Sequence, residues 1–122
     1  MEETVLKAKN DLAQLSQSPN LNETATKHSQ DMYVKNNLSH ESDEFGNLED
    51  RLKANEIDYE KADENLALGY YDAIEAVHGW MNSKDHREVI LNNRYNYVGA
   101  GVYMNYYTQI FIEKEGMEER NK

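Results

Sequence analysis

The sequence predicts a single α+β domain, mainly because the spacing of apolar residues changes along the chain. Up to about residue 91 most apolar residues recur at helical spacing, whereas two later runs, residues 97–103 and 106–112, are rich in Tyr, Val and Ile and typical of strands. A third strand is expected around Glu64, inside another apolar stretch. We therefore predict helices packed on a sheet, with residues 1–113 as the domain and residues 114–122 as a charged tail.

Length and composition limit the class of protein. The chain has 122 residues and one proline, which suits one domain with its own core. Only 39% of its residues are hydrophobic, and nine tyrosines supply much of the apolar area. We expect a thin core rimmed by tyrosines.

Charge and hydropathy exclude several partners. A net charge of −10 would repel a phosphate backbone, so no nucleic-acid partner is expected. No apolar run approaches the roughly 20 residues that span a bilayer, and no leader precedes the domain. The chain is thus either cytosolic or a domain of a longer exported protein. The absence of cysteine excludes disulfides and thiolate metal ligands without fixing the compartment.

The first third of the chain predicts two helices. Helical spacing favours one over residues 2–17, which Ser18-Pro19 would end. Asn22 is a suitable N-cap for a second helix that continues to about residue 36. His28 lies one position off the apolar face of this helix, so we expect it at the rim or in solvent.

A polar loop and a short helix follow. Residues 36–47 are turn-forming and contain His40. Asn47 predicts the N-cap of a helix over residues 47–55, with the aliphatic stem of Arg51 facing the domain.

Glu64 is the first candidate for a functional residue, because a charge inside an apolar run is costly to bury without a polar partner. Two helices are expected after it. Ser83 is a suitable N-cap for the second, over residues 83–91, with His86 near its start and Val89, Ile90 and Leu91 in the core. His78, on the first, is interpreted as structural. The inward face of the first is formed by Ala73, Ile74, Val77, Met81 and a largely buried Trp80.

The last two strands are joined by Met104-Asn105, which predicts a hairpin. Gly99 and Gly101 leave one strand face bare, so a helix or a ligand can approach the sheet closely.

Five motifs occur in order along the chain: Ser39-His40; Glu64-Asn65-Leu66-Ala67; Trp80-Met81-Asn82-Ser83 followed by His86-Arg87 and Ile90-Leu91-Asn92; Val98-Gly99-Ala100-Gly101-Val102; and Tyr107-Thr108-Gln109-Ile110-Phe111. Together they resemble the bacterial branch of the CAP superfamily, which unites cysteine-rich secretory proteins, antigen 5 and plant pathogenesis-related proteins. The resemblance covers nearly the whole chain. It implies an α-β-α sandwich with a central antiparallel sheet and a cleft where polar residues gather. It also implies an exported protein, as members of this family usually are.

The resemblance also assigns the cleft residues. His40 is similar to the family's first cleft histidine, and Glu64 to the glutamate of its Gly-Glu-Asn motif, in which Asp63 replaces the glycine here. Members of the bacterial branch have a histidine in a Ser-x-x-His-Arg motif, which His86 resembles here and which implies a second imidazole in the cleft. Animal and plant members have a second glutamate and a second histidine at the positions of Ser83 and Tyr106.

Three interpretations stay open. His40 and His86 with Glu64 could bind a divalent cation such as Zn²⁺ and activate a water, giving a metal-assisted, protease-like hydrolase. Glu64 and His40 could instead pair in a groove that recognises a small ligand, peptide, glycan or lipid. The pair could also be purely structural. We favour an extracellular or cell-surface domain that binds a ligand or partner, with or without a cation. The hydrolase is the alternative, although familiar hydrolase motifs are absent.

Overall fold

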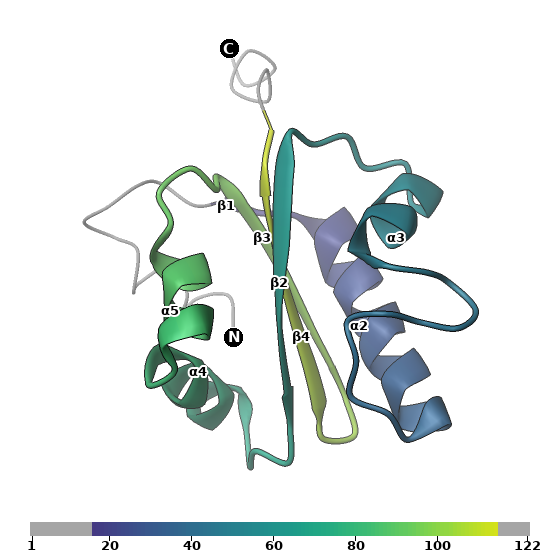
Figure 1. The fold of residues 1–122 in the computed structure, drawn as a ribbon, viewed down its shortest axis with the longest axis vertical. Coiled ribbons are helices and arrows are strands. Elements are labelled where there is room, and N and C mark those ends of the chain that lie inside the picture. Colours follow the sequence, from purple (N-terminus) through teal and green to yellow (C-terminus); the bar gives the residue numbers. More distant parts are fainter. Residues whose placement is uncertain (1–15, 115–122) are drawn as a thin grey trace.

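The structure, a computed structural model, describes residues 16–114 (Figure 1). In chain order its elements are β1 (Ser16–Gln17), α2 (Pro19–Lys35), α3 (Leu48–Ala54), β2 (Lys61–Leu68), α4 (Ala73–Met81), α5 (Lys84–Leu91), β3 (Tyr97–Tyr103) and β4 (Tyr106–Glu113). No helix within this part of the chain is both long and apolar enough to cross a membrane.

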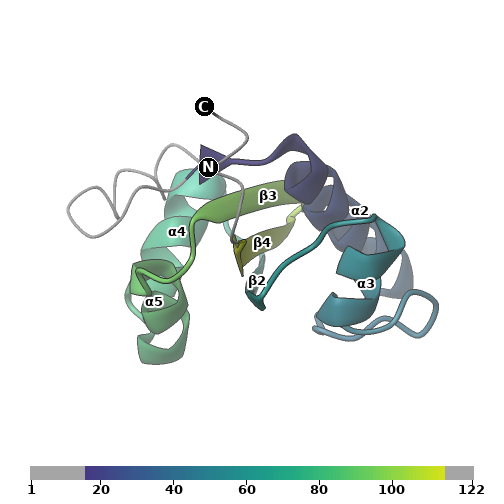
Figure 2. The same cartoon turned by 90° about the horizontal axis from the view of Figure 1, so that it is seen from above.

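The strands form one sheet in the order β1-β3-β4-β2. β4 is antiparallel to β2 and to β3, and the hairpin between β3 and β4 turns at Met104-Asn105 as predicted. The short β1 pairs parallel with β3, so the whole sheet is mixed rather than purely antiparallel. α2 and α3 cover one face of the sheet, whereas α4 and α5 cover the other (Figure 2). The predicted three-layer α+β sandwich is therefore confirmed.

The N-terminal boundary differs from the prediction. The helix expected over residues 2–17 falls largely outside the described residues, but Ser16 and Gln17 form β1 instead of its last turn. The N–H of Ser16 donates to the carbonyl oxygen of Asn96 at 2.9 Å. At these two residues, pairing with a strand distant in sequence replaces the predicted last helical turn.

α2 begins four residues earlier than expected, at Pro19. Ser18 is its N-cap, because the Ser18 hydroxyl accepts the N–H of Leu21. Proline suits the first helical position, since the N–H that it lacks would have no partner within the helix. Asn22 therefore lies inside α2, where its Oδ1 accepts the N–H of Ala100 at 2.9 Å and holds the helix against β3.

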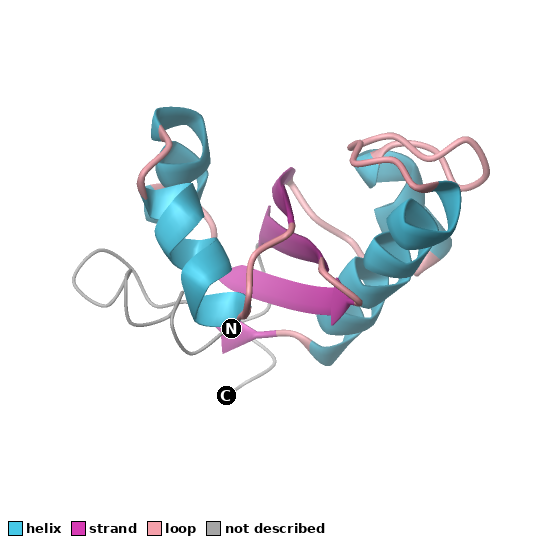
Figure 3. Cartoon of the chain, turned by 90° about the horizontal axis from the view of Figure 1, so that it is seen from below, coloured by secondary structure: helices cyan, strands magenta, loops and turns pink. Residues whose placement is uncertain are grey.

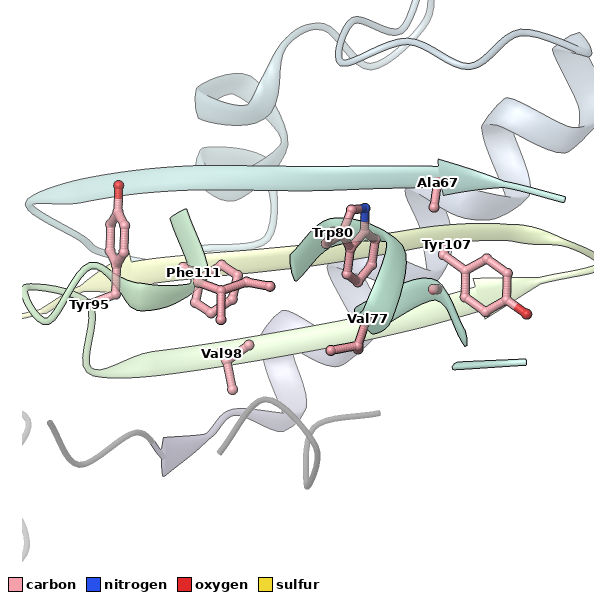
Figure 4. Packing of buried hydrophobic residues seen from close by; sticks show 9 residues of the cluster. Ala67, Val77, Trp80, Tyr95, Val98, Tyr107 and Phe111 are labelled. Carbon is pink, nitrogen blue, oxygen red and sulfur yellow. The ribbon is translucent and has the colours of Figure 1, made fainter. Parts of the chain in front are cut away.

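The sheet separates two apolar cores. One lies beneath α4 and α5, and Trp80 belongs to it with 2% exposure, as predicted (Figure 4). The other lies beneath α2 and α3. Tyrosine enters the interior as well as the rim, since four of the nine are buried: Tyr95, Tyr97, Tyr106 and Tyr107.

Three apolar positions are less buried than predicted. Ile74 is 57% exposed, because α4 turns Val77 and Trp80 toward the sheet and Ile74 outward. On α5 only Ile90 is fully buried, while Val89 and Leu91 pack half-buried at the edge of the core.

Gly99 and Gly101 allow α2 to lie directly on β3. A Cβ at Gly99 would collide with Leu21, and a Cβ at Gly101 would collide with Thr26. The bare strand face thus receives a helix rather than a ligand.

Candidate functional site

Glu64 is the buried centre of the candidate site. It lies in the middle of β2, and its side chain is only 2% exposed. Arg51 Nη1 donates to Glu64 Oε2 at 2.7 Å, and Arg51 Nη2 donates to Oε1 at 3.1 Å. A two-point, charge-assisted contact of this kind compensates the cost of burying a carboxylate. Glu64 therefore has the polar partner that its sequence context requires.

Helix α3 places Arg51 in this position. Its N-terminus is fixed by a capping box, in which Asn47 Oδ1 accepts the N–H of Asp50 and the Asp50 carboxylate accepts the N–H of Asn47. Leu52 next to Arg51 is fully buried and anchors the helix. The sequence predicted that the stem of Arg51 faces the domain but missed the role of its guanidinium, for which that inward position was the only signal.

His40 completes the cluster from the loop of residues 36–47. Its Nδ1 lies 2.9 Å from Glu64 Oε1, and its carbonyl oxygen accepts a hydrogen bond from Arg51 Nη2 at 2.7 Å. The structure thus contains the expected pair of His40 and Glu64, with Arg51 as a third member. Because the carboxylate can only accept, Nδ1 carries the proton, and Nε2 of the neutral imidazole is an acceptor.

The electrostatic environment keeps Glu64 ionised. Burial alone would raise the pKa of Glu64, but the hydrogen bonds from His40 and Arg51 and the charge of Arg51 together lower it below its ordinary value. The hydrogen bond with Glu64 raises the pKa of His40, although burial opposes this effect. The His40 side chain is 60% exposed. Its imidazole, which Glu64 holds in place and whose pKa is raised, therefore faces solvent.

His86 lies across from His40, near the start of α5. Its Nδ1 is 3.1 Å from Ser83 Oγ, so this hydroxyl contacts a side chain instead of capping the helix backbone. The carbonyl oxygen of His86 accepts a hydrogen bond from Asn65 Nδ2 at 3.2 Å, which ties α5 to β2 beside Glu64.

One groove of about 680 Å³ brings together the three residues that the sequence selected, His40, Glu64 and His86. β2 lines its floor, with the loop and the start of α3 on one side and α5 on the other. Four further carboxylates line it, which makes the groove acidic: Glu41, Glu49, Asp63 and Asp85.

The contacts of Glu64 limit its use as a ligand of the predicted cation. Both oxygens of Glu64 bind Arg51, whose positive charge would repel a cation from this carboxylate. His40 contacts Glu64 through Nδ1, which leaves its Nε2 as an acceptor. Among residues 16–114, no group of three or more His, Cys, Asp or Glu side chains could hold a metal ion. The contacts instead suit an imidazole that is oriented by a carboxylate.

The remaining histidines have other environments. His28, expected at the rim, is 1% exposed, and its Nε2 lies 2.8 Å from the carbonyl oxygen of Ser39. It therefore anchors the loop one residue before His40, and burial lowers the pKa of His28. His78, interpreted as structural, is exposed on α4.

Two departures from the family motifs have local roles. Asp63, in place of the motif glycine, accepts the N–H of Glu64 at its Oδ1 at 2.9 Å. Tyr106, in place of the second histidine, is buried, and its hydroxyl donates to Asn36 Oδ1 at 3.3 Å.

Comparisons with known proteins agree with this fold. The model of the CAP family, described as the cysteine-rich secretory protein family, matches residues 5–112. YlbC, an uncharacterized membrane protein of Bacillus subtilis, is 43% identical over 110 residues, which are 90% of this chain and 32% of that protein. The chain thus spans about a third of the length of this relative.

Solved structures give the same result. An extracellular protein containing an SCP domain from Bacillus anthracis is 34% identical with a TM-score of 0.86, over 92% of this chain and 40% of that one. An outer surface protein from Borrelia burgdorferi is 18% identical with a TM-score of 0.81, over 93% of this chain and 89% of that one, and this likeness concerns the fold alone.

Proposed function

This chain belongs to the CAP cysteine-rich secretory protein family, and from that premise we propose that it is a ligand-binding domain of an extracellular or cell-surface protein. The proposed binding site is the groove that contains His40, Glu64 and His86. The extracellular location is supported by the 34% identical Bacillus anthracis protein, which is described as extracellular.

The observation that carries this proposal is the fixed orientation of His40. The His40 side chain is 60% exposed, so it adds little buried surface to the fold. Nevertheless, the buried carboxylate of Glu64 holds its imidazole, and the buried guanidinium of Arg51 holds its carbonyl oxygen. Fixing a polar group before a ligand arrives reduces the entropy lost on binding. A purely structural pair would not need a groove in front of its exposed member.

The charge of the groove limits the ligand. The carboxylates of Glu41, Glu49, Asp63 and Asp85 surround the two histidines, so an anionic ligand would be repelled. We therefore propose a polar ligand that is uncharged or positively charged. Among small ligands, peptides, glycans and lipids, this chemistry disfavours anionic lipid headgroups.

Titration followed by NMR tests the proposal. The probes are a lysine-containing peptide, a neutral oligosaccharide of N-acetylglucosamine and vesicles of an anionic phospholipid. We expect at least one of the first two to shift groove resonances, and His40→Ala to weaken that binding about tenfold. His78→Ala is the matched control, because His78 is exposed outside the groove. Equal effects of the two variants, or no shift with either of those two probes, would contradict the proposal.

Calorimetric titration with Zn²⁺ at pH 6 and pH 8 tests the cation. Since Arg51 occupies both oxygens of Glu64, we expect the same weak binding by the parent and by His40→Ala at both pH values. A site that strengthens at pH 8 and depends on His40 would show instead that neutral imidazoles ligate the metal.

Hydrolysis is the second candidate function, and the contact of Glu64 with His40 Nδ1 favours it. A carboxylate that orients a histidine leaves Nε2 as a general base for a water or a hydroxyl. Turnover of a peptide and ester panel by the parent, abolished in a folded Glu64→Gln variant, would establish this function. A parent without turnover would leave the groove as a binding site.

A further inference from the structure

β2 forms an edge of the sheet. It pairs with β4 on one side, and within residues 16–114 no strand pairs with its other side. The two helical layers lie on either side of β2 and leave its outer edge between them (Figures 2 and 3). The groove follows this edge, because residues 62–65 of β2 line it.

The hydrogen-bonding phase of β2 shows which backbone groups face outward. In an antiparallel pair, the backbone groups of successive residues point alternately toward the partner and away from it. The N–H of Gly69 donates to the carbonyl oxygen of Asn105 at 3.0 Å, in register with the β2–β4 pairing. The odd-numbered residues of β2 therefore direct their backbone N–H and C=O groups toward β4. The even-numbered ones, Ala62, Glu64 and Leu66, direct their N–H and C=O groups outward.

Two side chains confirm this phase and cap part of the edge. Trp80 Nε1 donates to the carbonyl oxygen of Leu66 at 2.9 Å, and Asp63 Oδ1 accepts the N–H of Glu64 at 2.9 Å. Edge strands that are blocked in this way resist uncontrolled pairing with other chains. Both backbone groups of half-buried Ala62 and the carbonyl oxygen of Glu64 remain uncapped beside the groove, within the described part of the chain.

We propose that the outer edge of β2 binds an extended peptide as an added strand, in the groove between His40 and His86. Ala62 would exchange two backbone hydrogen bonds with one peptide residue, and the carbonyl oxygen of Glu64 would accept the N–H of a second. This inference rests on the proposed ligand-binding function and names its ligand class. Main-chain hydrogen bonds supply affinity in this mode, and side-chain pockets supply specificity.

The walls of the groove specify the peptide. Side chains of an added strand alternate between its two faces, so successive residues would face the wall with His40 and Leu48 and the wall with His86 and Val89. The four carboxylates of the lining favour lysine or arginine at these positions. The occupant is thus an extended basic peptide.

NMR with an eight-residue peptide of alternating lysine and threonine tests the binding mode. Hydrogen exchange of the Ala62 amide should slow at least fivefold when the peptide binds, because this amide gains a partner. The Asp63 amide is the internal control, since it already faces β4. The same peptide with N-methyl groups on alternate residues keeps the charge but loses backbone donors, and it should bind at least fivefold more weakly. Equal binding of both peptides would overturn the proposal.

Two variants of Asp63 supply an independent test. Asp63→Ala removes the charge and uncaps the N–H of Glu64, whereas Asp63→Asn removes the charge but keeps an acceptor. The peptide should therefore bind Asp63→Ala roughly 2- to 10-fold more tightly than Asp63→Asn, the worth of one backbone hydrogen bond. Equal affinities would show that the edge takes no part in binding.

The N-acetylglucosamine oligosaccharide separates failure of this inference from failure of the proposed function. If it binds in a His40-dependent manner while the basic peptide leaves the Ala62 amide unchanged, the groove is a ligand site and the added strand is wrong. If neither probe shifts any groove resonance, both proposals are overturned.

Discussion

At the residue scale, the ionisation of His40 and of Glu64 is linked to stability. The pKa of His40 lies above the ordinary value of 6.5, so its contribution is complete below pH 6.5 and is lost as the pH rises through the folded pKa. The pKa of Glu64 lies below the ordinary value of 4.5, so its contribution is present above pH 4.5 and is lost as the pH falls through the folded pKa. We expect this pair to contribute most in the window between these two ordinary values.

Melting temperatures measured from pH 4 to pH 9 check this expectation. The decline above pH 6.5 should be shallower in His40→Ala than in the parent, and His78→Ala should follow the parent because His78 is exposed outside the cluster. The effect should be small, since the His40 side chain is 60% exposed to solvent. Identical pH profiles of all three proteins would show that His40 and Glu64 are not coupled.

The contact between Arg51 and Glu64 is a separate residue-scale prediction. Both side chains are at most 5% exposed, so removing one leaves the other buried and unpaired. Arg51→Met should lower the free energy of unfolding by about 3–5 kcal/mol in urea titrations. The double variant Arg51→Met/Glu64→Gln should recover part of this loss, because no unpaired charge remains. A double variant less stable than Arg51→Met would point to lost packing instead.

These residues also show what the sequence can reveal about a site. Glu64 was predictable, because a carboxylate within an apolar strand needs a partner, and His40 came from the family resemblance. Arg51 was missed because inward-facing arginine stems are common, and helical phase does not show where a flexible guanidinium ends. His28 was placed at the rim from its helical phase alone. The carbonyl oxygen of Ser39, which satisfies it, belongs to a loop whose path the sequence does not specify.

At the scale of elements, the close approach of α2 to β3 depends on glycine. Gly101→Ala would drive a methyl group into the backbone of Thr26, so α2 would have to shift. We expect a loss of about 1–3 kcal/mol in the free energy of unfolding. Val102→Ala, at a position 47% exposed on the same strand, is the control and should cost less. A Gly101→Ala protein as stable as the parent would mean that α2 is free to move.

α4 depends on Trp80 in a similar way. Trp80 is buried between α4 and the sheet, and its indole also donates to the carbonyl oxygen of Leu66 (Figure 4). Trp80→Ala should therefore cost about 3–5 kcal/mol in urea denaturation. Tyr71→Ala removes an aromatic side chain that is 88% exposed, and this control should change stability little. Comparable losses in both variants would contradict the assigned orientation of α4.

Element boundaries were less predictable than element types. The signal Ser18-Pro19 was interpreted as the end of one helix, but the same pair is equally suited to begin one, as N-cap and first helical residue. In the structure this pair begins α2, and Ser16 just before it pairs with Tyr97, a contact distant in sequence that local signals do not reveal. By contrast, the hairpin of β3 and β4 is a local structure, and its turn was located correctly from Met104-Asn105.

At the scale of the whole molecule, the site is a consequence of topology. β2 follows the two helices on one face of the sheet and precedes the two helices on the other (Figure 1). Because β2 is also an edge strand, its outer edge lies between the two helical layers. Loop, helix and strand each supply one member of the His40, Arg51 and Glu64 cluster. Hydrophobic spacing predicted the layers, but it carries no information about strand order. The family resemblance was therefore needed to expect His40 and Glu64 in one cleft.

The strong negative charge of the molecule leads to a last prediction. The net charge is −10, and the excess negative side chains repel one another more strongly in the compact state than in the unfolded chain. Raising NaCl from about 10 mM to about 150 mM shortens the Debye length from about 30 Å to about 8 Å, so the melting temperature should rise. The exposed pair of Arg94 and Glu113 loses less than about 1 kcal/mol by the same screening, and it should not reverse this trend.

The buried pair of Arg51 and Glu64 provides the control for this salt effect. Salt does not reach these side chains, so the double variant Arg51→Met/Glu64→Gln, which has the same net charge as the parent, should show the same dependence on NaCl. Over the same range, the basic peptide should bind the parent more weakly as salt rises, because the carboxylates that attract it line an open groove. Stability and peptide affinity should therefore respond to salt in opposite directions. A peptide affinity that does not fall as salt rises would mean that the acidic lining does not attract the peptide.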